Sequence, residues 1–145
     1  MKLCYFLASV LLLLIGIAQP ATADVALQAR ILLQGAYDTP DGLMRDDLRS
    51  KGYLPTQQPY TLAPFHYTGN ETLNSTLTTV MGETAIVDWV LLDIRDRQTQ
   101  ALLARKALLV QRNGQVVEPL TGENTLVFGA IDPSEYRISI HHRNH

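Results

Sequence analysis

The chain has 145 residues, of which 46% are hydrophobic and 18% are charged, and its formal net charge is −2 at pH 7. This length suits one globular domain with a hydrophobic core of its own. The charges are scattered singly and form no basic patch, which argues against nucleic acids and anionic membrane surfaces as partners.

The first 23 residues have the layout of a secretory signal peptide. A basic start at Lys2 precedes an almost wholly apolar run over residues 3–17, and an A-x-A cleavage site follows at residues 21–23. The apolar run is about 15 residues long, whereas a membrane-spanning helix needs about 20. We therefore predict cleavage before Asp24 and no membrane insertion afterwards. The mature protein is then a single secreted module over residues 24–145, extracellular, at the cell surface or in the periplasm.

The single cysteine, Cys4, lies in the segment that we expect to be removed. The mature chain then has no disulfide, no thiolate nucleophile and no cysteine metal site. A secreted domain of this kind depends on its core for stability.

An alternation of apolar and polar residues over 27–34 predicts a half-buried strand that ends at Gly35. Turn-forming residues fill positions 37–42.

The only helical signal comes next. Asp41 is a candidate N-cap, Leu43 and Leu48 fall on one side of a helix, and Gly52 can end it. This pattern predicts one short helix near residues 42–51.

Prolines punctuate residues 54–80, and residues 70–79 are rich in Thr, Asn and Ser. We predict a loop with an edge strand here. Asn70 and Asn74 each begin a glycosylation acceptor triplet.

Residues 85–95 form the strongest predicted strand, with apolar side chains on both faces. Strict alternation places Ile86 and Val90 on one face, interrupted by Asp88, and Val87 and Trp89 on the other. Such a pattern is typical of a central strand that is covered on both sides.

Residues 102–117 predict a hairpin, because Asn113-Gly114 between apolar runs is typical of a type I′ turn. A turn at 121–124 leads to an apolar run at 126–128. A further turn at 132–134 precedes a last strand over 136–143.

Turn signals recur about every ten residues, and no βαβ rhythm is present. The sequence therefore predicts an all-β fold. Its form would be an antiparallel β-sandwich, Ig-like or jelly-roll-like, with one short helix near residues 42–51.

Several sequence segments, taken in their order along the chain, resemble an uncharacterised β-rich module found in large predicted secreted and cell-surface proteins of bacteria. These segments are Gly35-Ala36-Tyr37-Asp38, residues 42–49, residues 86–92, residues 107–114 and His142-Arg143-Asn144-His145. The resemblance covers nearly the whole mature chain. It implies an extracellular location and a β-sandwich-like module, and it implies no activity. The chain differs from the pattern in standing alone behind a signal peptide and in stopping at His145, so a shortened last strand and a fragment are both open.

The histidines near the end of the chain are candidate metal ligands. Adjacent strand residues point to opposite faces, so His141 and His142 cannot share a site within a regular strand. A metal site would need the chain to turn after Arg143, or His66 to approach His142 or His145 from elsewhere. The alternative is that His142 packs, hydrogen-bonded, at the edge of the core, while His141 and His145 are solvated.

The acidic loop that contains Asp38 and Asp41 is a possible calcium site, because calcium takes six to eight oxygen ligands. The spacing does not match an EF-hand loop, and both residues are ordinary turn and cap residues. We therefore expect the protein to require no cofactor, and calcium is the one candidate for a bound cofactor.

Carboxylates in the strongest strand invite a catalytic hypothesis. Asp88 lies on an otherwise apolar face, so it must be paired or hydrogen-bonded, and we favour a structural pair with Arg30, Arg105 or Arg137. Asp93 and Asp96 could support glycoside hydrolysis at the right separation, but solvated strand-end charges are the simpler interpretation.

Aromatic residues could form a sugar-binding strip. Trp89 in a central strand is expected to be part of the core. The proline-rich stretch is the expected place for exposed, ligand-binding rings, namely Tyr53, Tyr60, Phe65 and Tyr67.

These observations predict a secreted, non-enzymatic β-sandwich module with a binding, adhesive or structural role at the bacterial cell surface, whose partners are other surface proteins or glycans. One alternative is a carbohydrate-binding module that uses the aromatic stretch. Another is a small secreted hydrolase or metal-dependent enzyme, although the sequence lacks G-x-S-x-G, H-E-x-x-H and a glycine-rich phosphate loop.

Overall fold

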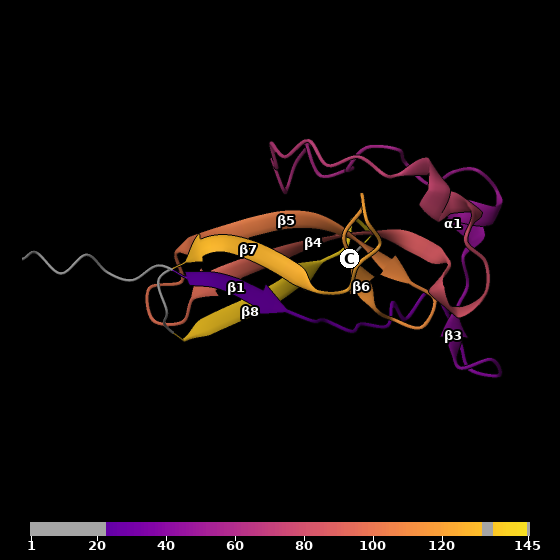
Figure 1. Cartoon of the computed structure of the whole chain (residues 1–145), viewed down its shortest axis with the longest axis horizontal. Helices are drawn as coiled ribbons and strands as arrows, with labels where there is room; N and C mark the ends of the chain where they lie inside the picture. Colours follow the sequence, from indigo (N-terminus) through magenta and orange to yellow (C-terminus); the bar gives the residue numbers. More distant parts are fainter. Residues whose placement is uncertain (1–22, 132–134, 145) are drawn as a thin grey trace, which may run out of the picture.

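The computed structural model describes residues 23–131 and 135–144 (Figure 1). Its strands and helices are β1 (Ala23–Leu27), β2 (Tyr37–Asp38), β3 (Leu43–Met44), α1 (Asp47–Ser50), the 3₁₀ helices η1 (Ser75–Thr79) and η2 (Gly82–Thr84), β4 (Ile86–Asp96), β5 (Leu102–Gln111), β6 (Val116–Val117), β7 (Leu126–Ile131) and β8 (Tyr136–His141). The predicted signal peptide up to residue 22 and the predicted turn at 132–134 lie outside the described residues.

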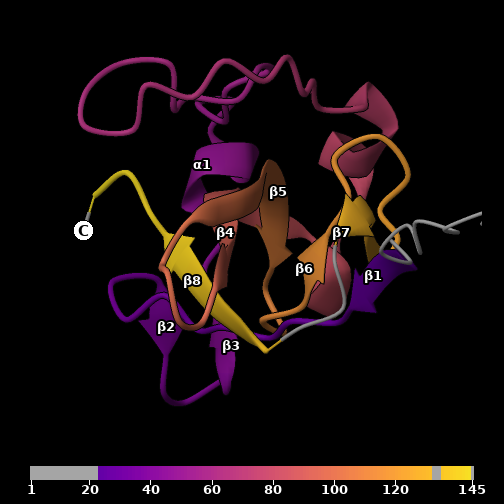
Figure 2. The ribbon, with the colours of Figure 1, turned by 90° about the vertical axis from the view of Figure 1, so that its left-hand side faces the viewer.

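Antiparallel pairing builds the whole fold. A four-stranded sheet has the order β6-β5-β4-β8, and β1 pairs with β7 in a second, two-stranded sheet. Figure 2 shows the two sheets curling around a common interior as a half-barrel. The prediction of an all-β, sandwich-like fold with one short α-helix is thus confirmed.

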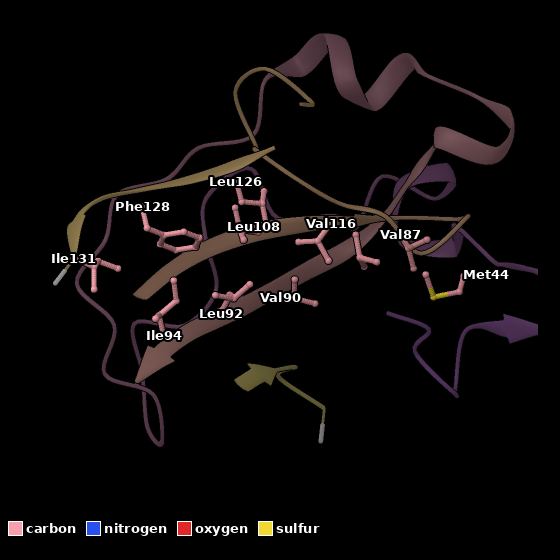
Figure 3. Packing of buried hydrophobic residues seen from close by; sticks show 11 residues of the cluster. Met44, Val87, Val90, Leu92, Ile94, Leu108, Val116, Leu126, Phe128 and Ile131 are labelled. Atoms are coloured by element: carbon pink, nitrogen blue, oxygen red, sulfur yellow. The ribbon is translucent and has the colours of Figure 1, made fainter. Parts of the chain in front are cut away.

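The interior of the half-barrel holds the larger of two apolar clusters (Figure 3). It consists of Met44, Val87, Val90, Leu92, Ile94, Leu108, Val110, Val116, Leu126, Phe128 and Ile131. Alternate residues from 25 to 33 pack against it, which confirms the predicted apolar face of the first segment. Regular strand nevertheless ends at Leu27, and the chain continues in extended form with one isolated bridge between Arg30 and Gln115.

The outer face of the same sheet carries the second apolar cluster. Its members are Tyr60, Ile86, Trp89, Leu91, Ala107, Leu109 and Val117. The stretch from residue 54 to 77, drawn in magenta above β4 and β5 in Figure 1, covers this cluster. β4 is therefore a central strand covered on both faces, as predicted. The edge strand expected within residues 54–80 is absent from this described stretch, which contains one isolated bridge and η1 instead.

A β-bulge in β4 changes which residues share a face. Val87 and Asp88 together oppose the single residue Val110 of β5. Val87 therefore joins the interior cluster, while Ile86 packs on the outer face with Trp89. The strict alternation assumed for Ile86 and Val87 is wrong because the bulge adds one residue to the strand.

The predicted helix over 42–51 is shorter than expected and begins later, at Asp47. Leu43 is instead in β3, so Asp41 is a turn residue and not an N-cap. The predicted end is confirmed: Gly52 has a φ of +72° and donates its N–H to Arg49 O. This arrangement is the usual glycine stop of a helix.

The predicted hairpin forms between β5 and β6, but its turn is not type I′. Only Gly114 has a positive φ, at +89°, and Gly114 N–H donates to Gln111 O at 2.8 Å. A type I turn followed by a left-handed glycine fits these observations. The glycine is required for a second reason, because a Cβ at Gly114 would lie 2.6 Å from Ile31 O.

In the described ranges, no helix is both long and apolar enough to cross a bilayer.

Candidate functional site

Asp88 forms the centre of a buried charge cluster. It is 3% exposed and follows the bulge at Val87. Its Oδ2 lies 3.0 Å from His142 Nε2 and 3.1 Å from Arg143 Nη2. Its Oδ1 accepts from Arg143 Nη2 at 3.0 Å and from Trp89 N–H at 2.8 Å. The structural pairing of Asp88 is confirmed, but its partners are His142 and Arg143 and not Arg30, Arg105 or Arg137.

A cleft of about 390 Å³ opens beside Asp88. It is lined by Leu33, Gly35, Ala36, Arg45, Asp47, Leu48, Val87, Asp88, His142 and Asn144. Main-chain and side-chain hydrogen bonds hold its walls together: Arg45 N–H donates to Ala36 O at 2.8 Å, and Arg45 Nη2 donates to Gly35 O at 3.1 Å. The cleft is thus preformed, with an apolar lining and charged groups at defined places, as ligand sites usually are.

The charged residues of the cleft differ in how they are hydrogen-bonded and in how far they are exposed. Both oxygens of Asp88 are hydrogen-bonded to neighbouring groups of the chain, which gives this side chain a structural role. Arg45 Nε lies 3.6 Å from Asp47 Oδ2, and the two side chains are 56% and 55% exposed. These two rim residues are therefore the charges that an entering ligand would meet first.

A second buried carboxylate lies on the outer face of β4. Asp93 is 0% exposed and accepts from Arg105 Nε at 2.6 Å and Nη2 at 2.7 Å, and from Arg95 Nη2 at 2.9 Å. His141 Nε2 lies 3.4 Å from it. Although burial opposes ionisation, the hydrogen bonds from Arg105 and Arg95 lower the pKa of Asp93 below its usual value. The prediction that Asp93 is a solvated strand-end charge is therefore wrong.

Three consecutive residues supply both clusters. His141 reaches Asp93 on the outer face, and His142 and Arg143 reach Asp88 on the other face. For the two histidines this division follows from the alternation of side chains along an extended chain, as the sequence predicted. Arg143 lies beyond the end of β8 and reaches the same carboxylate as its neighbour His142. The side chain of His142 is 10% exposed and hydrogen-bonded, as expected, whereas that of His141 is 38% exposed and only partly solvated.

The metal candidates do not come together. Asp38 is half-buried in β2, Asp41 is exposed in the turn that follows, and His66 is exposed in the 54–77 stretch. His145 lies outside the described residues. Within the part of the chain that the structure describes, no three His, Cys, Asp or Glu side chains are grouped so that they could hold a metal ion. The calcium site and the histidine metal site therefore stay predictions.

The aromatic candidates do not form an exposed strip. Tyr53 is 72% exposed, but Tyr60 is fully buried, and its ring meets the Phe65 ring edge-on at 5.1 Å between centroids. Phe65 and Tyr67 are half-buried, and the Tyr67 hydroxyl donates to Glu71. The expectation of an exposed Tyr60 ring is wrong because this ring packs against the outer face of β4.

Sequence reasoning missed the cleft and Arg143. The cleft lies between the segment after β1, the region of α1 and the bulge in β4. No local sequence pattern indicates that these three parts come together. The signal for Asp88 was present, since an acid on an apolar face must find partners. The position of its partners at the end of β8 depends on strand order, which the sequence did not reveal.

No model of a known protein family, no curated protein and no solved structure matches this chain.

Proposed function

We propose that the chain is a secreted, non-enzymatic binding module of the bacterial cell surface and that the cleft beside Asp88 is its binding site. The partners would be glycans or other surface molecules small enough to place a group in about 390 Å³. The leader-like first 23 residues and the resemblance to extracellular modules support the location. The cleft supports the binding role.

The single observation that carries the proposal is the composition of the cleft. Apolar side chains and two exposed rim charges, Arg45 and Asp47, line a preformed hollow. None of the described residues that line it is a serine, threonine, cysteine, lysine or tyrosine. Aspartate and histidine can also act as nucleophiles, but in this lining Asp88 is bonded to His142 and Arg143, and Asp47 lies beside Arg45. These features favour binding over hydrolysis.

The alternative of a carbohydrate-binding strip on residues 53–67 loses its support because Tyr60 is buried. Stacking on sugars needs a flat, accessible ring, and Tyr53 alone of the four rings is largely exposed. We therefore place glycan recognition, if the partner is a glycan, in the cleft.

A pair of glycine substitutions tests the cleft. A Cβ at Gly35 meets nothing within 4 Å, so a side chain can start there, and Gly35→Phe adds a ring to the cleft lining. A Cβ at Gly129 in β7 also meets nothing within 4 Å, and Gly129 does not line the cleft, so Gly129→Phe is the matched control. On an array of bacterial and host glycans, we expect spots that retain the wild type and Gly129→Phe and lose Gly35→Phe. Binding that ignores Gly35→Phe, or turnover of the immobilised glycans, would contradict the proposal.

Mass spectrometry of the exported protein tests the location. We expect the mature chain to begin at Asp24. An intact Met1 would rule out cleavage of the leader.

A further inference from the structure

β8 is an edge strand whose outward main-chain groups can be identified. It pairs with β4 along one side, from Leu91 opposite His141 to Asp96 opposite Tyr136. Arg97 N–H donates to Glu135 O at 3.0 Å, which fixes the alternation of the hydrogen bonds. The main-chain groups of residues 137, 139 and 141 therefore face β4, and those of Ile138 and Ile140 face away from it.

The outward groups of Ile138 and Ile140 have no hydrogen-bond partner in the described part of the chain. Edge strands are usually protected against further pairing by charged side chains, a proline or a bulge. β8 has the sequence YRISIH, its pairing with β4 is continuous, and the side chain of Ile138 is 49% exposed. Within this strand the protection against pairing is the charge of Arg137, and no proline or bulge adds to it.

A groove lies along the end of this edge. It measures about 350 Å³ and runs between residues 31–34 and residues 140–142. Leu32 on its wall is 52% exposed. Leu33 and His142 line both this groove and the cleft beside Asp88, so the two hollows are neighbours. An added strand lies about 4.8 Å from its neighbour, and on the outward side of β8 this groove borders Ile140.

The charges around β8 indicate what an added strand should carry. Arg137 lies directly opposite Arg95 on β4, and like charges in that position repel. Arg95 is paired with Asp93, whereas Arg137 donates to Gln100 Oε1 and has no ion pair among the described residues. A carboxylate on the next strand would lie beside Arg137 and offset this repulsion.

We propose that the free edge of β8 binds an extended segment of another polypeptide by strand addition. The segment is apolar at alternate positions, which cover Ile138 and Ile140 and extend the interior cluster. It carries an acidic residue between them, on the face of Arg137. A polypeptide fits this edge because its N–H and C=O groups alternate at the spacing of the outward groups of β8. This inference does not rest on the cleft as a ligand site.

Two capped synthetic peptides test the proposal with the purified chain. One is Ser-Val-Glu-Val-Glu-Val-Ser, and the other has Lys in place of both Glu. We expect the acidic peptide to shift the backbone amide NMR signals of Ile138 and Ile140 and to bind at least about tenfold more tightly than the basic one at low salt. Arg137→Gln should remove most of that difference.

Ile138→Pro removes one outward N–H without removing a hydrogen bond to β4, and proline is tolerated at such edge positions. We expect this variant to bind at least about tenfold more weakly, while the control Ile138→Val binds like the wild type. A second measurement leaves the protein unchanged: methylating alternate main-chain nitrogens of the acidic peptide, on the edge facing β8, should abolish binding. Gly35→Phe, which occupies the cleft, should leave peptide binding unchanged.

Three results would overturn the proposal. The first is that neither peptide binds at about 1 mM, which is the weakest affinity of interest. The second is that the methylated peptide binds as well as the unmethylated one. The third is that Ile138 and Ile140 signals shift with protein concentration alone and the peptide does not compete, since the edge would then serve a second copy of this chain.

Discussion

The Tyr60 hydroxyl satisfies a main-chain carbonyl of β4 that no neighbouring strand reaches. Removing this hydroxyl therefore tests how the fold is stabilised. β8 ends opposite Leu91, so the side of β4 beyond that point has no strand neighbour. The hydrogen-bond alternation along β4 directs the Trp89 carbonyl to that same side. The Tyr60 hydroxyl donates to Trp89 O at 2.8 Å and thereby satisfies it. Burial, assisted by the negative charge of Asp88, raises the pKa of Tyr60, so this hydroxyl stays a donor.

The expected cost of Tyr60→Phe follows from the burial of both partners. Tyr60 and Trp89 are each 0% exposed, so water cannot readily replace the hydroxyl. The substitution keeps the ring, its packing and its contact with Phe65 and removes one oxygen. A buried carbonyl left without a partner costs about 1–3 kcal/mol. We expect a loss of about 2 kcal/mol in the free energy of unfolding, which is a large fraction of the stability of a small domain.

Urea denaturation monitored by tryptophan fluorescence measures this loss directly, because Trp89 is the only tryptophan in the chain. Tyr53→Phe is the matched control, since Tyr53 is 72% exposed and should change the stability by less than about 0.5 kcal/mol. If Tyr60→Phe also costs less than about 0.5 kcal/mol, water or a main-chain shift satisfies the Trp89 carbonyl, and the reasoning fails.

Three further predictions concern the turn, the outer charge cluster and metals. Gly114→Ala should lower the free energy of unfolding by more than about 1 kcal/mol, because it puts a Cβ at positive φ and 2.6 Å from Ile31 O. Gly35→Ala has neither problem and is the control. Equal melting temperatures of the two variants would contradict this prediction. The lowered pKa of Asp93 stabilises the fold above the unfolded pKa of about 3.9, and this contribution is lost as the pH falls through the lower folded value. Asp93→Asn should therefore destabilise the protein at pH 7 and flatten the acid limb of a plot of unfolding free energy against pH; an unchanged limb would count against the assignment. Calcium, zinc and a chelator should leave the melting midpoint unchanged, and a shift would reinstate the sites at Asp38 and Asp41 or at the histidines.

Local patterns predicted the elements of this fold well where one strong signal dominated. The two-sided apolar run of β4, the hairpin at Asn113-Gly114 and the glycine stop at Gly52 all depend on short-range chemistry, and the structure contains each of them. The errors arose where one extra residue or one tertiary contact intervened. The bulge at Val87 reversed the face of Ile86, and no period-two pattern encodes a bulge.

The candidate site was harder to predict than the fold. Asp88 and Asp93 were both noticed, but the same residue type on one strand received opposite interpretations, paired and solvated. Both are in fact buried and paired: Arg105 of β5 and Arg95 of β4 bind Asp93, and His142 and Arg143 after β8 bind Asp88. For Asp88 the missing step was that β8, and not another strand, lies next to β4, and strand order is a property of the whole chain.

The two carboxylate clusters also explain how the edge strand β8 is held in one register. A slip of β8 by one residue would move every side chain to the opposite face of the sheet. His141 would then leave Asp93, which would keep Arg95 and Arg105, but the slip would also carry His142 and Arg143 away from Asp88, which depends on these two side chains. Removing one partner from a buried charge is strongly destabilising, so the slipped registers are disfavoured. The outward groups of Ile138 and Ile140 are therefore held at fixed positions before any partner arrives, and a preorganised edge loses little conformational entropy when a strand is added to it.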